Sequence, residues 1–415
     1  MSDTEHLRIA RGTPAFRKTI VALFIGGFSI FAQLYCVQPM IPMFAREFSI
    51  SAAAASLSVS ATTAGLAIGM LFTGALSEAI GRKPMMVASV FGSAALLLLS
   101  TLVTTWHELV VIRTLTGFAL SGLPSIAMAY VSEEIETKSV GFAMGLFIGG
   151  SAIGGMMSRF VAGSVSDATS WRTALIMVGT MGIINSALFY KALAPSRNFV
   201  PKPQSLRSLL NGYRLHLSDP GLRVLFAMGF LVMGSFVTMY NYLGFRLLAP
   251  PFNLNQTQVS SIFLVYVAGI GSSTIVGALG DLLGRRRVLW VTLVIMLVGL
   301  SLSLINSVAM TVVAMAIYTF GFFGAHSVAS TWVGRRASVA RAQASSLYLL
   351  CYYMGSSVVG TVGGVALALA GWAGVVGMVA VLLSLALAGA LWLTQLPPVA
   401  SAEQNDEIIP PAIEG

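Results

Sequence analysis

The chain has 415 residues, of which 56% are apolar and only 9% charged, whereas about a quarter of the residues of a soluble domain are charged. This composition excludes a soluble enzyme or binding protein, and it provides enough apolar sequence for about a dozen membrane spans of ~20 residues each. The formal net charge of +9 would suggest a nucleic-acid partner in a soluble protein, so it requires a different explanation here. The two cysteines, Cys36 and Cys351, lie in apolar runs and support neither a disulfide framework nor a metal site.

Apolar runs bounded by charged or turn residues predict an all-α membrane protein with twelve transmembrane helices. In chain order, we expect them at about 20–44, 53–78, 85–105, 108–130, 140–165, 172–193, 222–247, 257–281, 288–305, 309–333, 343–369 and 374–396. Short connections favour antiparallel neighbours, and the one long connection is the proline-containing stretch 194–221. The sequence therefore predicts two six-helix bundles, 20–193 and 222–396, joined by a linker at 194–221 and flanked by tails at 1–19 and 397–415.

Basic residues are distributed unevenly over the predicted connections. If both tails are cytoplasmic, nineteen Lys and Arg lie on the cytoplasmic side, and only Arg46, Arg172 and Arg246 lie on the other side. Because basic residues resist translocation, we expect both termini on the cytoplasmic side of a bacterial inner membrane. This distribution accounts for the net charge, so we expect contact with the lipid bilayer and no nucleic-acid partner.

A ten-residue motif occurs twice, at 74–83 and 277–286, with the frame Gly-x-Leu-x-(Glu/Asp)-x-x-Gly-Arg-(Lys/Arg). The acids Glu78 and Asp281 stand at the C-terminal ends of their predicted helices, where they oppose the helix dipole. We therefore expect each to face a helix N-terminus of the opposite half, near Ala344 or Gly141. The alternative is a generic charged turn. The predicted gate residues are Gly74, Glu78, Gly81, Arg82, Lys83, Gly277, Asp281, Gly284, Arg285 and Arg286.

Two parallel six-helix repeats carrying this motif resemble the major facilitator superfamily. Residues from about 12 to 396 are most similar to its twelve-span drug:proton antiporter type, in the bacterial inner-membrane YnfM branch. The resemblance implies that 74–83 latches a cytoplasmic gate in the outward-facing state. It also implies that Arg113 takes part in proton coupling, and that 149–155 is an antiporter motif in which Ser151 replaces the usual proline.

The sequence allows two placements for the side chains of Arg113 and Arg159. Arg113 lies within a span, where a charged residue is a functional candidate by default, but its side chain could instead snorkel to the outer face. Arg159, one turn beyond the antiporter-like segment, could face a central cavity or snorkel outward.

Polar and aromatic residues in the spans expected to line a cavity are candidates for substrate contacts. They are Tyr35, Gln38, Phe236, Tyr240, Asn241, Tyr318, Phe322, Tyr348 and Tyr352. In the first span, Pro39 and Pro42 are expected to break the helix beside Gln38. Ordinary packing is the alternative for each aromatic residue.

No acidic residue lies in the middle of a predicted span, where the titratable side chains are Arg113, Arg159 and His326. Histidine changes charge near neutral pH and arginine does not, so His326 is the first candidate for proton coupling and Arg113 the second. A neutral packing histidine is the alternative. The missing acid disfavours obligate cations and favours sugars, amphiphilic drugs or organic anions.

These observations together predict a secondary transporter that is not an enzyme, has no cofactor and acts as a monomer. We expect it to export a small neutral or amphiphilic solute, coupled to protons, by rocker-switch alternating access. A proton-coupled importer of a small organic solute or anion is the main alternative. A transporter-like sensor and a channel are less favoured.

Overall fold

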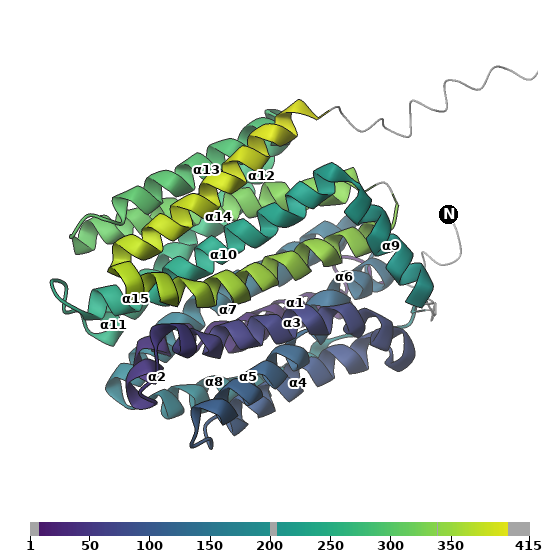
Figure 1. Cartoon of the computed structure of the whole chain (residues 1–415). Helices are drawn as coiled ribbons and strands as arrows, with labels where there is room; N and C mark the ends of the chain where they lie inside the picture. Colours follow the sequence, from purple (N-terminus) through teal and green to yellow (C-terminus); the bar gives the residue numbers. More distant parts are fainter. Residues whose placement is uncertain (1–7, 200–205, 338, 397–415) are drawn as a thin grey trace, which may run out of the picture.

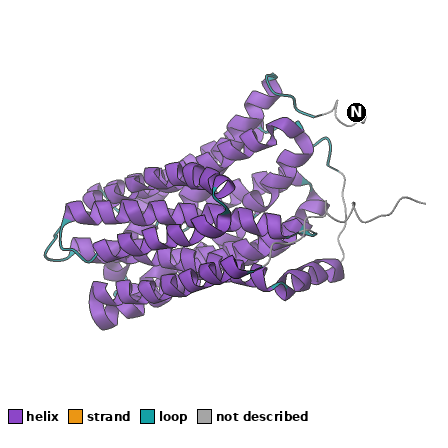
Figure 2. Ribbon diagram, turned by 90° about the horizontal axis from the view of Figure 1, so that it is seen from above, coloured by secondary structure: helices purple, strands orange, loops and turns teal. Residues whose placement is uncertain are grey.

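The computed structural model describes residues 8–199, 206–337 and 339–396. Apart from one isolated β-bridge between Ile9 and Ile135, the regular structure in these ranges is helical. Figure 2 shows the long helices running side by side along one common direction. Residues 1–7 and the whole predicted tail 397–415 lie outside the described residues, as does 200–205 of the predicted linker.

The first half of the chain forms six spans from nine helical segments. They are α1 (Pro14–Tyr35), η2 (Gln38–Met40), α2 (Ile41–Glu47), α3 (Ala52–Ile80), α4 (Arg82–Leu99), α5 (Trp106–Leu120), α6 (Gly122–Glu134), α7 (Val140–Ala168) and α8 (Trp171–Ala192). A short 3₁₀ turn, η3 (Thr137–Ser139), precedes α7. The first span is interrupted between α1 and α2, as the two prolines predict, and the fourth is interrupted at Ser121, between α5 and α6.

The second half begins after a linker that contains a helix of its own. The linker helix is α9 (Leu206–Ser218). The second half then consists of α10 (Pro220–Leu248), α11 (Gln256–Ser261), η4 (Ile262–Val265), α12 (Tyr266–Leu282), α13 (Arg285–Leu302), α14 (Val308–Arg336) and α15 (Arg341–Gln395). Ala370 and Gly371 have non-helical dihedral angles and divide α15 into two spans.

The described part of the chain has ten helices that are long and apolar enough to cross a membrane. This count takes α15 as one helix, although its kink divides it into two spans. It also leaves out α13, whose first turn carries three arginines. With these two additions, the number of spans is the predicted twelve. The fold class is therefore confirmed: two six-helix bundles make up the protein, and Figure 1 shows α10, α13, α14 and α15 grouped apart from α1, α3, α4 and α5.

The same close helix contact occurs in both bundles. A Cβ at Gly150 of α7 would lie 2.3 Å from the Phe24 carbonyl oxygen of α1. A Cβ at Gly355 of α15 would lie 2.1 Å from the Phe230 carbonyl oxygen of α10. Glycine permits backbones to approach this closely, so the paired contact is a structural counterpart of the sequence repeat.

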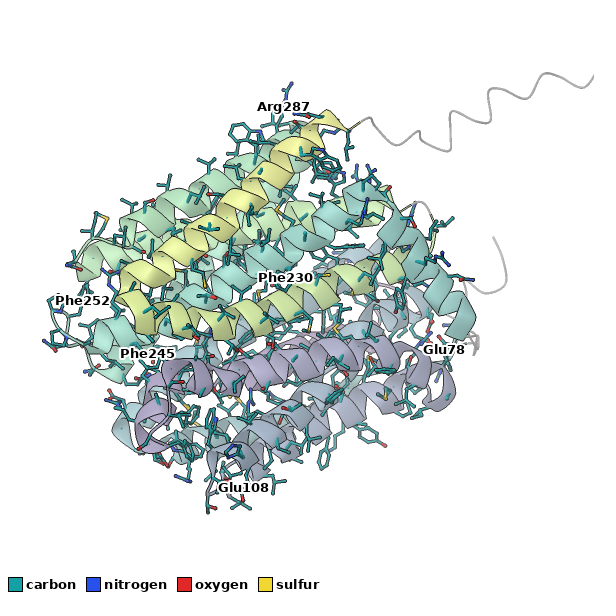
Figure 3. The ribbon with its side chains drawn as sticks, in the orientation of Figure 1. Glu78, Glu108, Phe230, Phe245, Phe252 and Arg287 are labelled. Atoms are coloured by element: carbon teal, nitrogen blue, oxygen red, sulfur yellow. The ribbon has the colours of Figure 1, made fainter. Side chains whose placement is uncertain are left out.

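We call the end of the molecule that holds Glu78 and Asp281 the motif end, and the opposite end the far end. Figure 3 shows Glu78 at the motif end and Phe252 at the far end. Several hydrogen bonds join the two halves at or toward the far end. Among them, Gln256 Nε2 donates to the Pro39 carbonyl (2.5 Å), Thr257 Oγ1 to Asp167 (2.7 Å) and Ser357 Oγ to the Ser60 carbonyl (2.7 Å). The halves are therefore closed against each other there.

Candidate functional site

The break in the first span creates the centre of the candidate site. Pro39 has no N–H to donate to the carbonyl of Tyr35, so α1 ends at Tyr35 and the chain continues as the 3₁₀ turn η2. The last carbonyl groups of a helix lack partners within it, and in a membrane they must be satisfied by other groups. The interruption also leaves Gln38 buried between the two bundles.

Arg113 provides the missing donors. Its Nη1 donates to the Gln33 carbonyl (3.2 Å), its Nη2 to the Leu34 carbonyl (2.8 Å) and its Nε to the Ser58 carbonyl of α3 (3.0 Å). The side chain is 0% exposed, so it does not snorkel. A cation at the C-terminal end of α1 is also favoured by the helix dipole. Arg113 thus stabilises the break in the first span; its part in proton coupling stays a prediction.

Arg159 of α7 is equally buried but is held differently. Its Nε donates to Gln38 Oε1 (2.6 Å) and its Nη1 to the Gly155 carbonyl. The guanidinium carbon lies over three rings, at 4.1 Å from the centroid of Tyr35, 4.9 Å from Tyr266 and 5.5 Å from Phe263. The side chain is 3% exposed, which decides between the two alternatives left by the sequence: Arg159 does not snorkel.

Gln38 connects Arg159 to the second half of the chain. While its Oε1 accepts from Arg159, its Nε2 donates to Asn241 Oδ1 of α10 (2.8 Å). The hydroxyl of Tyr266 is buried without a hydrogen-bond partner among the described residues. We define the Arg159 cluster as Arg159, Tyr35, Gln38, Asn241, Phe263 and Tyr266, three residues from each half of the chain.

Four of the predicted substrate contacts pack against one another in the second bundle. The rings of Phe236 and Phe322 are stacked with centroids 3.6 Å apart, and Tyr318 stacks on Phe236 at 6.1 Å. The Tyr240 hydroxyl is 2.6 Å from Thr319 Oγ1. All four rings are buried, an arrangement that agrees with the packing alternative.

His326, Tyr348 and Tyr352 continue this aromatic packing toward the motif end, since the His326 ring stacks on Phe322 with centroids 6.2 Å apart. His326 Nδ1 lies 3.0 Å from the Tyr348 hydroxyl, and the His326 ring lies 4.6 Å from the ring of Tyr352. His326 and Tyr352 are half-buried. Among the described residues no acid bonds His326, so its role in proton coupling stays a prediction.

The acids of the repeated motif pair with arginines of their own half. Arg82 binds Glu78 (2.7 Å) and Glu133 (2.9 Å). Asp281 binds Arg285 and also Arg335, the latter at 3.3 Å. We predicted that Glu78 and Asp281 each face a helix N-terminus of the opposite half. That contact stays a prediction, for a state in which the motif end is closed. A Cβ at Gly141, one of the two expected contact points, would meet open space in this structure.

Both motif copies need their second glycine for a backbone reason. Gly81 and Gly284 adopt φ angles of +98° and +87° between consecutive helices, a region in which a side chain is strained. Lys83 Nζ then reaches the Leu193 carbonyl, and Arg286 Nη1 reaches the Thr394 carbonyl (3.1 Å). Each motif therefore fastens a sharp turn to the last helix of its bundle.

One acid outside the motif fixes the linker to the second bundle. Asp219 caps α10 by accepting from the Leu222 amide (2.8 Å) and pairs with Arg336 Nε of α14 (2.7 Å). Partial burial alone would raise the pKa of Asp219, but the Arg336 guanidinium and the backbone amides hold that pKa below its ordinary value.

The protein has twelve spans in two similar bundles, a break in the first span, and one copy of the charged motif in each bundle. These features define a multi-pass membrane transporter rather than an enzyme. The family model described as Major Facilitator Superfamily matches residues 23–252 and 237–410. The chain belongs to this family.

Individual relatives agree with this assignment. The chain is 47% identical to the uncharacterized MFS-type transporter YybF of Bacillus subtilis, over 93% of this chain and 95% of the relative. It is 45% identical to the inner membrane transport protein YnfM of Escherichia coli, over 91% of each. Among solved structures, a bacterial homologue of the human lysosomal transporter Spinster, in an inward-facing and occupied conformation, superposes with a TM-score of 0.77. That likeness covers 92% of this chain and 98% of the other at 14% identity, and it shows the fold alone.

Proposed function

We propose that this chain is a secondary active transporter of the bacterial inner membrane that exports a small amphiphilic solute in exchange for protons. The observation that carries the proposal is the unequal closure of the two ends. Hydrogen bonds join the halves toward the far end, whereas at the motif end Asp281 pairs with Arg285 and Arg335 of its own half. Two rigid bundles that meet at one end are the geometry of alternating access.

The orientation follows from the basic residues. Arg82, Lys83, Arg285 and Arg286 are all at the motif end, and basic residues favour the cytoplasmic side. With the motif end in the cytoplasm, this structure is an inward-facing state. The salt bridges of Glu78 and Asp281 with their own arginines would then rearrange when the motif end closes, which is the latch that the resemblance implies.

Export and proton coupling rest on the resemblance to drug:proton antiporters, and His326 is the group proposed to carry the proton. A proton-coupled importer would use the same architecture. The two are separated by measuring solute movement in everted membrane vesicles with and without a pH gradient. An exporter accumulates solute in everted vesicles when the interior is acid, whereas a proton-coupled importer releases it.

The transporter proposal itself is tested by counterflow. Purified protein is screened by thermal shift against sugars, dyes and organic acids, and a stabilising compound is loaded into proteoliposomes. Saturable uptake of labelled compound against the unlabelled load is expected, because one site must alternate between the two faces. Unsaturable flux without counterflow would indicate a channel and would contradict the proposal.

A further inference from the structure

The geometry points to the Arg159 cluster as a binding site for the acidic group of an organic anion, with the three rings around Arg159 receiving its apolar or aromatic body. This inference rests on the proposed transport function and names the class of solute. It is carried by the difference between two buried arginines, by an unpartnered hydroxyl beside one of them and by the aromatic surroundings of that residue.

Arg113 and Arg159 are both almost completely removed from solvent, but all three nitrogens of the Arg113 guanidinium donate hydrogen bonds to described residues, whereas only two of Arg159 do. Three nitrogens of Arg113 each donate to a backbone carbonyl. Arg159 uses Nε and Nη1 only, and no described residue accepts a hydrogen bond from its Nη2. Among the described residues no carboxylate pairs with Arg159 either. Because a buried cation is costly unless it is paired, Arg159 is prepared for an anion that the chain itself does not provide.

A second group points to the same place. The Tyr266 ring lies under the Arg159 guanidinium, and its hydroxyl is buried without a partner. Tyr266 is 5% exposed, so solvent does not satisfy the hydroxyl fully. A carboxylate offers two acceptor oxygens, and arginine can bind them through two parallel N–H donors. A neutral sugar would offer hydroxyl groups and leave the guanidinium charge uncompensated.

The surroundings of the charge select the rest of the solute. Tyr35 comes from the first half, and Phe263 and Tyr266 come from the second, so rings of both halves lie within 5.5 Å of the guanidinium carbon. Flat apolar groups pack well against such rings. The preferred ligand is therefore an amphiphilic monoanion, and an aromatic carboxylate is the simplest example.

The site also connects ligand binding to the contact between the halves. Gln38 Oε1 accepts from Arg159 while Gln38 Nε2 donates to Asn241 of the opposite half. A carboxylate that binds Arg159 competes with Gln38 for the guanidinium. Occupancy of the site thus changes one hydrogen-bonded bridge that spans the two bundles.

The test is a binding series on the full-length protein in nanodiscs. The probes are three aromatic acids, benzoate, salicylate and cinnamate, together with the neutral amides benzamide, salicylamide and cinnamamide. We expect at least one acid to bind while its amide does not. In Arg159→Gln the affinity for that acid should fall by about 10- to 100-fold, as for loss of a hydrogen bond to a charged group. Arg159→Lys should recover only part of it, because lysine lacks the planar fork.

The matched control is Arg172→Gln, which removes a far-end arginine that pairs with Glu47 and also stacks on a tryptophan, at 4.2 Å from the Trp171 centroid. This variant should bind the acids as the wild type does. Equal binding of acid and amide, undiminished acid binding by Arg159→Gln, or no binding of any acid would each overturn the inference.

Transport is measured separately, so that the two proposals can fail independently. If a neutral compound from the thermal-shift screen shows saturable counterflow while no acid binds, the anion site is wrong and the transporter stands. If acids bind in an Arg159-dependent manner but no compound shows counterflow, the transport proposal is wrong and the anion site stands.

Discussion

The closure of the far end can be tested at Gly364 of α15, which lies against Ala53 of α3 in the opposite half. A Cβ built on Gly364 would be 2.4 Å from Ala53 Cα and 2.5 Å from Ala53 N. Both atoms belong to the backbone, so rotation of a side chain cannot relieve the overlap. The variant Gly364→Ala must therefore separate the two helices or weaken this closed state.

The expected size of the effect follows from the overlap. Ordinary van der Waals contact begins at 3.4 Å, so the two helices would have to move apart by about 1 Å. Overpacking of this kind costs about 1–3 kcal/mol. The cost disappears when the halves separate at the far end, so the equilibrium should shift toward the state open there by about 5- to 150-fold.

The assay is the labelling rate of one cysteine inside the interface. Ser60 is fully buried and its hydroxyl has no partner among the described residues, so Ser60→Cys removes no hydrogen bond. Cys36 and Cys351 are both replaced by alanine, so that the reporter is the one thiol present. The rate of modification by a polar maleimide in nanodiscs should rise with the open fraction. Because the expected shift is about 5- to 150-fold, even its lower limit is measurable.

Two control variants in α15 distinguish a shift of the conformational equilibrium from a general loss of folding stability. A Cβ at Gly377 would have no neighbour within 4 Å, so Gly377→Ala should label as the parent protein does. A Cβ at Gly363 would be 2.4 Å from Thr238 Cγ2 of its own bundle, so Gly363→Ala should lower the melting temperature without exposing the reporter cysteine. If Gly364→Ala and Gly377→Ala label at the same rate, the closed far end is refuted.

Four further outcomes are expected. Transport by His326→Ala should lose its pH dependence while membrane insertion is kept, and an unchanged pH profile would exclude the histidine. Glu78→Gln should reduce turnover more than solute binding, and an equal loss of binding would mean that the residue is not a gate. Arg113→Met should lower the melting temperature, because it removes three buried hydrogen bonds and takes from the Leu34 carbonyl its side-chain donor, a loss of about 1–3 kcal/mol; a wild-type melting temperature would contradict its structural role. Asp219→Ala should destabilise by about 1 kcal/mol through loss of the α10 cap. Because the folded-state pKa of Asp219 is lowered, its stabilisation is present above the unfolded pKa and lost only as pH falls through the folded value. The melting difference should therefore be the same at pH 7 and pH 5, and a difference that vanishes by pH 5 would be inconsistent with the ion pair.

The sequence predicted the features that depend on local chemistry. Apolar length determines a span, and so the twelve spans could be placed to within a few residues. Pro39 and Pro42 lack N–H donors, which is why the break of the first span was foreseeable. The sequence also singled out Gly81 and Gly284 as motif residues, although the positive φ that each adopts is known only from the structure.

Features that depend on partners distant in sequence could not be predicted in this way. Arg159 is surrounded by Phe263 and Tyr266, about a hundred residues later in the chain, because the eighth span is interrupted by η4. No proline or glycine occurs between Gln256 and Tyr266 to signal that interruption. Gln38 and Asn241 were recognised singly as candidates, but their mutual hydrogen bond exists only through the contact between the two bundles.

The two buried arginines differ in a way that bears on alternating access. Every hydrogen-bond acceptor of Arg113 belongs to the first bundle, so its environment moves with it as one body when the halves rock. The cage of Arg159 is divided, because Gln38 and Tyr35 belong to its own bundle whereas Phe263 and Tyr266 belong to the other. Separation of the halves at the far end removes two rings from the guanidinium, and water or a bound anion must replace them. The free energy of Arg159 therefore depends on the conformational state and on occupancy together, which is the property that a site in a coupled transporter requires.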